Sequence, residues 1–569
     1  TTTEEVDTRP QESGINLIDN CESSYRIIYQ KDAPSTIINA ASELSSFLKQ
    51  SSTCELPYSV DTGEEFNPDN KVISLGFTNI YEGSGLEITE DMHKTGYYIK
   101  RFGNTVVINA KDGNGVMNAV YDMLNYLVDL EFYSSEEFAM EYYRTIPLLD
   151  FDIKHIPYID VRDILKKTLT SQYKRRMRLY TGEGSGQWVT FAHTVITQYL
   201  PTSTYASEHP DWYNGAKTQV CYSNEEMRHE MAKQIEERIV ASKYGQYVMI
   251  GHEDNWDICN CANCQAEMAL YGGYSGQELH FTNELSKEVD AWLADNQPGR
   301  EIDYVFFAYQ TSQMPPVKTE MVNGKEVVAK DADGYCVPFY DNFNIRKNVI
   351  VIYCPIDSDF SLGFSETENA AQYQQLIGWR DIFYKSNLYN NILIWSYSLA
   401  CRDYMIPFNN FGAVKDAYRF YKDLGACYVM DQSTYDSAIP CFEDLSIYTQ
   451  SKLMYRSDVD YNDLADDFIN HYYGEAAEHF REYFYFIRSH YKKNNVPGAL
   501  FNVLCTPSLW PLETIELMMN TAAHKTFDEE MGKLGNGADR ENESLRQNTA
   551  NLQVNTHAHK LLNEEINLS

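Results

Sequence analysis

The stretch Tyr247–Cys264, YVMIGHEDNWDICNCANC, changes character twice within its length. It begins as a short apolar run typical of a buried strand, and Gly251 lets the backbone turn out of that strand. Charged side chains follow directly, and three cysteines stand close behind them. The stretch therefore predicts a buried strand whose carboxyl end carries side chains able to do chemistry.

Six other apolar runs end in the same way, and helical patterns such as residues 225–242 separate them. The runs are YIDVRD (158–163), WVTFAHT (188–194), IDYVFFAYQ (302–310), NVIVIYCPID (348–357), NILIWSYS (391–398) and ACYVMDQ (426–432). Strand–helix alternation over roughly 280 residues is typical of a (β/α)8 TIM-like barrel. Seven strands are clear, and we expect the eighth near RRMRLY (Arg175–Tyr180). A doubly wound parallel sheet shows the same alternation and stays the alternative.

The chain on either side of this α/β barrel has other patterns. Residues 1–24 form a polar leader. Residues 25–157 alternate short strands with amphipathic helices, which predicts a small α/β domain. The catalytic barrel is expected over residues 158–474, and helical patterns predict a helical C-terminal region over residues 475–569.

Size and charge exclude several classes of function. The chain has 569 residues and a formal net charge of −35. A field of that sign repels nucleic acid and anionic lipid, and no apolar run is long enough for a transmembrane helix. We therefore expect neither nucleic-acid binding nor membrane insertion. The sequence opens without a methionine or a signal-peptide core, so its localisation has to be inferred indirectly, and its oligomeric state stays unknown.

The predicted strand ends supply a set of candidate site residues, because catalytic groups of such barrels lie at the carboxyl ends of the strands. The set comprises Arg162, Asp163, His193, His252, Glu253, Asp254, Tyr309, Asp357, Trp395, Tyr397 and Asp431. Glycoside hydrolysis needs one carboxylic acid to protonate the leaving oxygen and a second group to meet the oxocarbenium-like centre. Solvated loops also make strand ends polar, but seven strands ending this way favour a site.

Glu253 and Asp254 are adjacent, so on an extended chain their side chains point in opposite directions. One is expected to face the substrate while the other braces it or binds a neighbouring hydroxyl. Such a pair also suits substrate-assisted cleavage, in which one carboxylate orients a 2-acetamido group and the other acts as the acid. The alternative is a strand-end turn with two solvated acids.

Cys259, Cys261 and Cys264 form a C-x-C-x2-C cluster, which is one thiolate short of a structural zinc site. His252 or another cysteine could supply a fourth ligand. A local disulfide with one free thiol, or three buried thiols, is an equal alternative, because the usual two-knuckle spacing of zinc sites is absent. We expect a structural role in stapling the loop that carries the acids. No cofactor and no metal are predicted, and the three cysteines are only weak metal candidates.

Residues 310–347 form a long connection after a predicted strand. The segment VKTEMVNGKEVVAK within it predicts a hairpin that turns at Asn323-Gly324. Because the connection follows a carboxyl end, the hairpin is expected to rise beside the site and limit access to chain ends. The sequence thus favours an exo-type pocket.

An ordered set of motifs carries a resemblance to a known family. In chain order they are AHT…LP…HPDWYNG…QVCYSN, GHEDNWDICNCANC, ELHFTNELSKEVD, FAYQTSQMPP, NVIVIYCPID, LIWSYS…P.NNF, DLGACYVMDQ and YYGEAAEHFREY. Over roughly residues 25–490 the chain resembles a large, mostly uncharacterised bacterial family allied to the α-glucuronidases and β-hexosaminidases. The resemblance implies a small α/β domain before a catalytic (β/α)8 barrel, in a secreted or cell-surface carbohydrate-active protein.

The resemblance also implies site residues. The family's recurrent aspartate before the cysteines falls on Asp254, and its histidine falls on His193. Its aromatic pair falls on Trp395 and Tyr397, with Ser396 where an acid is common. The Asp-Glu pair of the hexosaminidases stands here in the reversed order, Glu before Asp.

We therefore predict an exo-acting glycoside hydrolase that removes a terminal sugar, N-acetylhexosamine or a related one, from a glycan. Glu253 is assigned as the general acid, Asp254 orients the substrate or stabilises charge, and Asp431 is the candidate second carboxylate. The predicted sugar-binding residues are Arg162, His193, His252, Tyr309, Trp395 and Tyr397.

Three other functions stay open. An α-glucuronidase-like activity on acidic side chains needs a cation, which Arg162 or Arg402 could supply. A non-catalytic glycan-binding protein could use the same scaffold. A zinc-dependent deacetylase or hydrolase would use the cysteine cluster.

Overall fold

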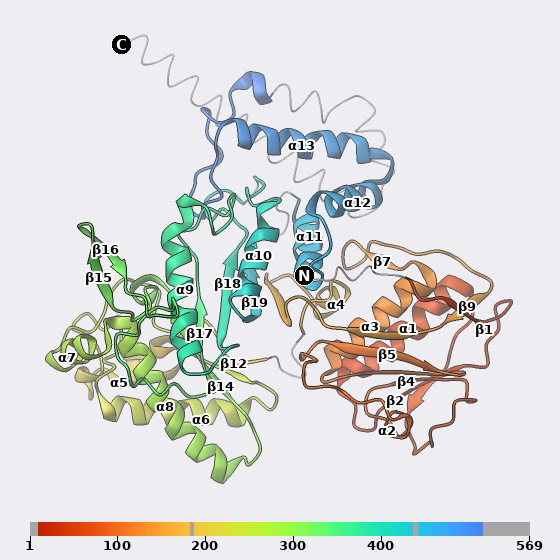
Figure 1. Cartoon of the computed structure of the whole chain (residues 1–569), viewed down its shortest axis with the longest axis horizontal. Coiled ribbons are helices and arrows are strands. Elements are labelled where there is room, and N and C mark those ends of the chain that lie inside the picture. Colours follow the sequence, from red (N-terminus) through yellow and green to blue (C-terminus); the bar gives the residue numbers. More distant parts are fainter. Residues whose placement is uncertain (1–8, 182–186, 405, 436–441, 516–569) are drawn as a thin grey trace. The chain divides into compact units, whose positions relative to one another are not determined.

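The computed structural model describes residues 9–181, 187–404, 406–435 and 442–515 (Figure 1). The chain divides into two compact units, and each is described by itself. Unit 1 comprises Thr1–Thr181, Ser398–Tyr418 and Gln432–Ser569, and unit 2 comprises Gly182–Tyr397 and Arg419–Asp431. The predicted domain boundaries stay a prediction, since these units group the segments differently.

Unit 1 contains a six-stranded mixed sheet in the order β10-β5-β6-β4-β2-β3. Its strands are β2 (Arg26–Tyr29), β3 (Tyr58–Val60), β4 (Val72–Leu75), β5 (Tyr97–Phe102), β6 (Thr105–Ala110) and β10 (Asp152–His155). The pairs β2–β3, β2–β4 and β4–β6 are parallel, whereas β5 pairs antiparallel with both β6 and β10. Helices α1 (Ser35–Ser52) and α3 (Gly113–Val128) contact each other, and each contacts this sheet. These strands and helices lie within residues 25–157, for which the sequence predicts a small α/β domain.

The helical periodicity predicted the buried faces of both helices. In α1 the expected face of Ile37, Ala41, Leu44 and Leu48 is at most 3% exposed. In α3 the expected face is equally buried, and it consists of Val116, Val120, Leu124 and Leu127. The helices therefore use their apolar stripes as amphipathic helices do.

Unit 1 also holds smaller elements and the C-terminal helices. Short strands are β1 (Glu12–Ile18), β7 (Glu131–Phe132), β8 (Phe138–Ala139), β9 (Ile146–Leu149) and β11 (Val161–Leu165). The helices are α2 (Asn79–Ser84), α4 (Ser171–Arg176), α11 (Glu443–Tyr455), α12 (Tyr461–Tyr473) and α13 (Ala477–Lys493). Helix α13 confirms helical structure after residue 475, and most of the second predicted helix, LETIELMMNTAAHKTFDEEM, lies outside the described residues.

Unit 2 is built on a parallel sheet with the strand order β12-β13-β14-β17-β18-β19, which is also the chain order. The strands are β12 (Trp188–Thr190), β13 (Tyr247–Ile250), β14 (Asp303–Ala308), β17 (Val349–Tyr353), β18 (Ile392–Tyr397) and β19 (Ala426–Gln432). The helices that alternate with them include α6 (Glu225–Ala241), α7 (Ala262–Tyr271), α8 (Tyr274–Asn296) and α9 (Ala370–Lys385), and α10 (Ala413–Asp423) straddles the unit boundary. The short helix α5 (Thr202–Tyr205) and the single turns η1 (Val195–Tyr199) and η2 (Pro210–Trp212) precede α6.

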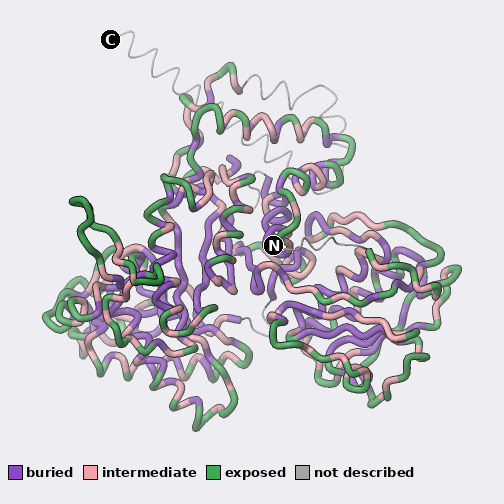
Figure 2. The backbone as a smooth tube through the Cα atoms, in the orientation of Figure 1, coloured by how far each residue is buried: buried purple, intermediate pink, exposed green. Residues whose placement is uncertain are grey.

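The sheet of unit 2 curls enough for side chains of β12 and β19 to meet across its inner face. Tyr428 on β19 accepts hydrogen bonds through its hydroxyl from Gln187 Nε2 at 2.7 Å and from Trp188 Nε1 at 3.3 Å, beside β12. In a flat sheet these two strands would be five strand spacings, about 24 Å, apart. The inner face is filled by aromatic rings, because Trp188 also packs on Tyr247 and Phe191. The buried strands are purple in Figure 2. The mixed α/β fold with this curled parallel sheet is consistent with a TIM-like barrel.

The expected eighth strand is not observed at its predicted place. Helix α4 begins before the predicted strand and includes its first two residues, Arg175 and Arg176. The Thr170 side chain caps the first turn of this helix by accepting from the Tyr173 amide at 3.1 Å. A capped helix uses the amides that a strand would have offered to its neighbours. The first predicted strand, YIDVRD, contains β11, which is grouped with unit 1.

The predicted hairpin is confirmed. Strands β15 (Thr319–Val322) and β16 (Lys325–Val328) pair antiparallel, with Val322 opposite Lys325. Asn323 and Gly324 both have positive φ, 52° and 75°, as a tight turn of this type requires.

Candidate functional site

Gly251 brings the carboxyl ends of β12, β13 and β14 close together. A Cβ added there would lie 2.2 Å from the carbonyl oxygen of Ala192 and 2.7 Å from the ring of Phe307. Its amide donates to Thr194 Oγ1 at 2.9 Å, and its carbonyl accepts from the Thr194 amide at the same distance. The glycine is therefore needed for close approach between strand ends as well as for leaving the strand.

Asp254 is the exposed acid of this region. Its Oδ1 accepts hydrogen bonds from the Tyr309 hydroxyl and from Gln310 Nε2, both at 3.0 Å. Both donors come from the end of β14, the neighbouring strand. Two bonds to one oxygen fix the orientation of the carboxyl group and leave Oδ2 without a described hydrogen bond.

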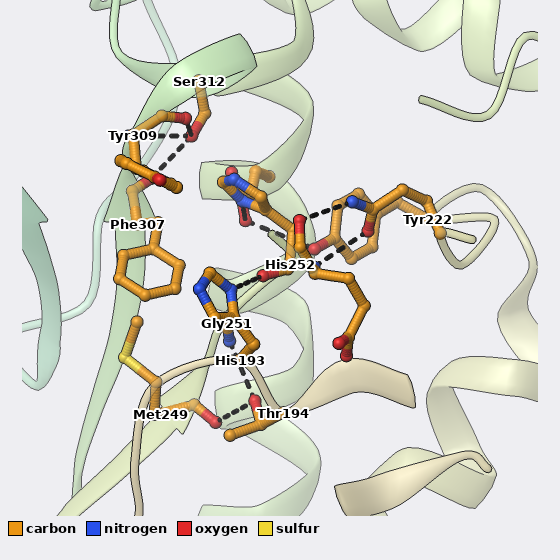
Figure 3. Close-up of polar contacts among 12 residues, drawn as sticks. His193, Thr194, Tyr222, Met249, Gly251, His252, Phe307, Tyr309 and Ser312 are labelled. Carbon is orange, nitrogen blue, oxygen red and sulfur yellow. Dashed lines mark hydrogen bonds and ion pairs between the residues drawn. The ribbon is translucent and has the colours of Figure 1, made fainter. Parts of the chain in front are cut away.

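The Tyr309 hydroxyl stays protonated and donates its hydrogen bond to Asp254. Its side chain is buried, and burial together with the charge of Asp254 raises the pKa of its hydroxyl well above the usual range. The phenol therefore keeps its proton through the neutral and moderately alkaline range. Its amide is held by Ser312 Oγ at 3.3 Å, as Figure 3 shows, so the strand end that carries it is also fixed.

Glu253 faces away from Asp254, as alternation on an extended chain predicts. Its Oε1 accepts from the backbone amides of Ile196 at 2.8 Å and Thr197 at 3.0 Å, at the start of η1. A carboxylate in this position satisfies amides that a helical turn leaves without partners. The Glu253 side chain thus ties the end of β13 to the segment after β12.

Gln219 holds the backbone of the same segment. Its side-chain amide donates to the Glu253 carbonyl at 2.8 Å and accepts from the Glu253 amide at 3.1 Å. It also donates to Asn255 Oδ1 at 3.1 Å, and the Gln219 side chain is buried. The Gln219 side chain thus pairs with both the amide and the carbonyl group of Glu253, as the backbone of a neighbouring strand would. Asp254, the next residue, is therefore rigidly placed.

His193 borders the acid segment. Its Nδ1 lies 2.5 Å from the carbonyl oxygen of His252, and its ring lies 5.2 Å from that of Phe307 (Figure 3). Because a carbonyl oxygen only accepts, Nδ1 carries the proton of this hydrogen bond. His193 is half-buried, which suits the predicted contact with a sugar hydroxyl.

His252 does not face a substrate. It is fully buried, and its Nδ1 lies 3.0 Å from Glu278 Oε1 on α8. The Tyr222 hydroxyl donates to the same oxygen at 3.2 Å, and burial together with the Glu278 charge raises the Tyr222 pKa. His252 therefore belongs to a polar network behind the sheet, which corrects its prediction as a sugar-binding residue.

A protein-family model matches more than half of the sequence. Residues 132–328 and 338–485 match the model of a domain of unknown function, DUF4838. The chain belongs to the DUF4838 family. No match was found among curated proteins.

The fold also has distant likenesses among solved structures. CpGH84B has 12% identity and a TM-score of 0.43, with 98% of this chain and 92% of that chain covered. The β-N-acetylhexosaminidase from Bacteroides fragilis has 11% identity and a TM-score of 0.41, over 82% of this chain and 92% of that one. The N-acetyl-β-hexosaminidase of Streptomyces plicatus has 11% identity and a TM-score of 0.42, over 81% and 92%. The functional argument for this DUF4838 chain rests instead on its own residues.

Trp395 and Tyr397 line the inside of the curled sheet of the DUF4838 chain. Trp395 stacks on Phe191 with ring centroids 5.2 Å apart and lies 6.2 Å from Phe307. Tyr397 lies 6.2 Å from Phe360, and both predicted residues are at least nine-tenths buried. Both rings therefore pack mainly against other aromatic rings and expose little surface.

Asp431 lies on the outer face of the sheet. Tyr428, three residues earlier on the same strand, points inward to Trp188, so alternation turns Asp431 outward. There the charge of Asp431 adds to burial in raising the pKa of Tyr421, whose hydroxyl lies 3.2 Å from Ser396 Oγ. This corrects the expectation that Asp431 supplies a second carboxylate beside Asp254.

Arg162 belongs to unit 1, and its guanidinium group is occupied by hydrogen bonds within the protein. It donates to the carbonyls of Arg178, Ile159 and Asp160 and to Thr95 Oγ1, and it is 1% exposed. Burial lowers its pKa to about 10. This corrects its prediction as a sugar-binding cation and weakens the α-glucuronidase alternative.

Sequence reasoning missed three contributors. Gln219 and Cys221 lie in the motif QVCYSN, which carried the family resemblance but received no role. Trp256 follows the acids by two residues and is 67% exposed, and an aromatic side chain beside exposed acids was the available signal. The predicted cysteines Cys259 and Cys264 are brought together with Cys221, as described below.

Proposed function

We propose that this protein is an exo-acting glycoside hydrolase in which Asp254 is the general acid. The observation that carries the proposal is an exposed carboxyl group at a strand end whose Oδ1 is held by Tyr309 and Gln310. A proton on Oδ2 then points away from both donors and can pass to a leaving oxygen. Parallel strands of this fold class place their reactive groups at this end.

The proposal exchanges the roles expected for the two adjacent acids. Glu253 accepts two backbone amides and is partly buried, so its carboxylate positions the segment. Asp254 is exposed, Tyr309 and Gln310 hold its carboxyl group, and Gln219 holds the backbone of the preceding residue. A general acid must reach the substrate, and among these two residues only Asp254 does so.

The second partner in the reaction is proposed to come from the substrate. Asp431 faces outward and Glu253 is held by amides, so neither stands opposite Asp254 as a nucleophile. A 2-acetamido group can replace the missing carboxylate, as in substrate-assisted glycosidases. This supports a terminal N-acetylhexosamine as the sugar that is cleaved.

The proposed hydrolysis has two steps. The acetamido carbonyl oxygen attacks C1 while the bond from C1 to the glycosidic oxygen breaks, and that oxygen takes the proton from Asp254 Oδ2. Water then attacks C1 of the oxazolinium intermediate, and the Asp254 carboxylate takes one of its protons. The sugar is released with its acetamido group restored, and Asp254 is again protonated.

A non-catalytic glycan-binding function is the second candidate. It is favoured by one observation, that neither of the other two acids assigned to catalysis is free to act with Asp254: Glu253 is held by backbone amides, and Asp431 faces outward. Exposed Trp256 would serve a binding site as well as a catalytic one, because an aromatic face packs against sugar C–H groups. A secreted or cell-surface location remains a prediction for either function.

The test is hydrolysis of a panel of glycosides by wild-type protein and by Asp254→Asn. The panel pairs each 4-nitrophenyl glycoside with a natural disaccharide that has the same terminal sugar and includes N-acetylhexosaminides and uronides. Asp257→Asn is the matched control, because Asp257 lies on the same loop, is exposed and accepts only from Thr218 among the described contacts.

A general acid matters most when the leaving group is poor. Asp254→Asn should therefore slow cleavage of the natural N-acetylhexosaminide far more than cleavage of the 4-nitrophenyl glycoside, whose leaving group needs little protonation. Asp257→Asn should behave as wild type. Equal losses on both leaving groups would remove the acid role, and binding of glycans without any turnover would establish the second candidate.

A further inference from the structure

Four cysteine sulfurs meet beside the segment that carries Asp254. The Sγ atoms of Cys221, Cys259, Cys261 and Cys264 all lie within 4.8 Å of one another. Cys221 Sγ lies 3.6 Å from both Cys261 Sγ and Cys264 Sγ. Cys221 is about forty residues from the others in sequence, so only the fold assembles the set.

We propose that these four cysteines bind one structural zinc ion. A disulfide would need sulfurs about 2.05 Å apart. Four thiolates about 2.3 Å from a tetrahedral zinc ion lie about 3.8 Å from one another, close to the separations of Cys221. The spacing of the cluster is therefore that of a metal-centred tetrahedron and not that of a bonded pair.

The local backbone favours thiolates. Cys261 is the N-cap of α7, and its Sγ accepts from the Cys264 amide at 3.4 Å. Cys261 and Cys264 thus lie at the amino end of a ten-residue helix, where the partial positive charge stabilises negative sulfur. Amide donation to metal-bound sulfur is the usual second layer of such sites.

A hydroxyl completes that second layer. Ser223 Oγ lies 3.1 Å from Cys264 Sγ, 3.4 Å from Cys221 Sγ and 3.6 Å from Cys261 Sγ. It can donate its one proton to any of these sulfurs. The cluster is thus lined by donors, as a set of negatively charged ligands requires.

Four protein ligands fill the tetrahedral positions, which makes the site structural. A catalytic zinc ion keeps one position open for water or substrate, and this set leaves none. Cys221, Cys259 and Cys264 are buried and Cys261 is exposed, so the ion would lie just beneath the surface. The zinc-dependent hydrolase considered from the sequence is therefore not supported.

The ion would join the two segments that position Asp254. Cys221 follows Gln219 by two residues, and Gln219 holds the Glu253 backbone. Cys259 follows Asp254 by five residues. Zinc would cross-link the segment Gln219–Cys221 to the segment Asp254–Cys259. Such a cross-link would keep the exposed carboxyl group of Asp254 in a fixed position.

Metal analysis of the purified full chain tests the proposal, and the result does not depend on the glycosidase function. Protein produced without a polyhistidine tag should contain one zinc ion per chain by inductively coupled plasma mass spectrometry. Cys221→Ser and Cys264→Ser should lose the zinc. Cys401→Ser is the matched control, because Cys401 is an exposed cysteine outside the cluster, and it should keep the zinc.

A second measurement remains decisive if the serine variants do not fold. Wild-type protein stripped of metal and titrated with cobalt(II) should show thiolate-to-metal charge-transfer bands and the intense visible bands of tetrahedral cobalt, saturating at one ion per chain. Absence of stoichiometric metal, or disulfides among these four cysteines by peptide mass analysis, would overturn the proposal. Stoichiometric iron in the purified protein would overturn the assignment to zinc.

Discussion

Two strand ends predicted from the sequence carry similar charged residues, and the structure places those residues differently. In unit 1 the strand β11 continues to Leu165, so both charged residues lie within it. Arg162 is buried among carbonyls, and Asp163 accepts from Lys174 at 2.6 Å. At β13, in unit 2, Glu253 is held by amides while Asp254 is exposed. The difference teaches that a charge at a strand end indicates a site only when the surrounding structure leaves it unburied.

The largest effect should separate the two aspartates. Asp254→Asn is expected to lower kcat/KM on a natural glycoside by about 100- to 10,000-fold, the usual contribution of a general acid, with little change in Tm because the side chain is exposed. Asp163→Asn removes a buried partner of Lys174 and should lower Tm while leaving kcat nearly unchanged. Glycoside kinetics and thermal unfolding of both variants measure this, and a loss of kcat in Asp163→Asn that matches Asp254→Asn would break the comparison.

The next effect concerns stability at β11. Arg162→Met removes the only donor described for the carbonyls of Arg178 and Ile159, and leaving such groups without a partner should lower the free energy of unfolding by about 3 kcal/mol. Urea unfolding measures the loss. Arg456→Met is the control, because Arg456 pairs with Asp458 at the surface and should cost at most about 1 kcal/mol. Equal losses in the two variants would show that Arg162 is not a structural centre.

A pH effect should distinguish the buried ion pair near β11 from exposed acids. Glu443 contacts Lys166, and burial raises the Glu443 pKa to about 7, against partial opposition from Lys166. The unfolded chain therefore releases this proton at lower pH than the folded chain. Stability from this group is present below the ordinary pKa of 4.5 and is lost as pH rises toward 7, by about 1 to 3 kcal/mol.

Unfolding in urea near pH 5 and near pH 7.5 checks this sign. Glu443→Gln should flatten the decline, whereas Glu478→Gln, an exposed acid on α13, should leave it as in wild type. A wild-type stability that rises over the interval with an unchanged slope in Glu443→Gln would contradict the expected direction.

A smaller effect is expected from the hydroxyl that holds Asp254. Tyr309→Phe removes one of two hydrogen bonds to Oδ1 and should lower kcat/KM by about tenfold, the equivalent of about 1.4 kcal/mol. Its raised pKa keeps the phenol protonated, so the wild-type rate should show no alkaline loss from this group below about pH 10. Tyr389→Phe, an exposed tyrosine, is the control in the same assay. A Tyr309→Phe rate equal to wild type would remove the positioning role.

The smallest effect on short substrates should come from the hairpin β15–β16. The Ala329 amide donates to the Lys318 carbonyl at 2.9 Å, so residues 319–328 can be replaced by a short glycine linker with little change at the base. We expect unchanged activity on a monosaccharide glycoside and increased cleavage within polymers. Unchanged products from both substrates, followed by chromatography, would show that the hairpin does not enforce exo action.

Periodicity predicted much of the fold because burial of apolar faces is a local signal. The helix faces of α1 and α3 and the hairpin turn at Asn323-Gly324 follow directly from spacing and from turn chemistry. The eighth strand was predicted wrongly at Arg175–Tyr180, where a capping threonine and a run of good helix formers outweigh the apolar residues. The uses of Arg162 and Asp431 were also missed, because burial of a charge depends on distant partners.

The sequence by itself determined the alternation of strands and helices, the family of the chain and the short segment in which the acid stands. These are properties of neighbours along the chain. Only the tertiary structure decided which acid is exposed, which face Asp431 takes and which cysteine joins the cluster. Those outcomes depend on contacts between residues far apart in sequence, such as Gln219 with Glu253 and Cys221 with Cys264, which no local pattern records.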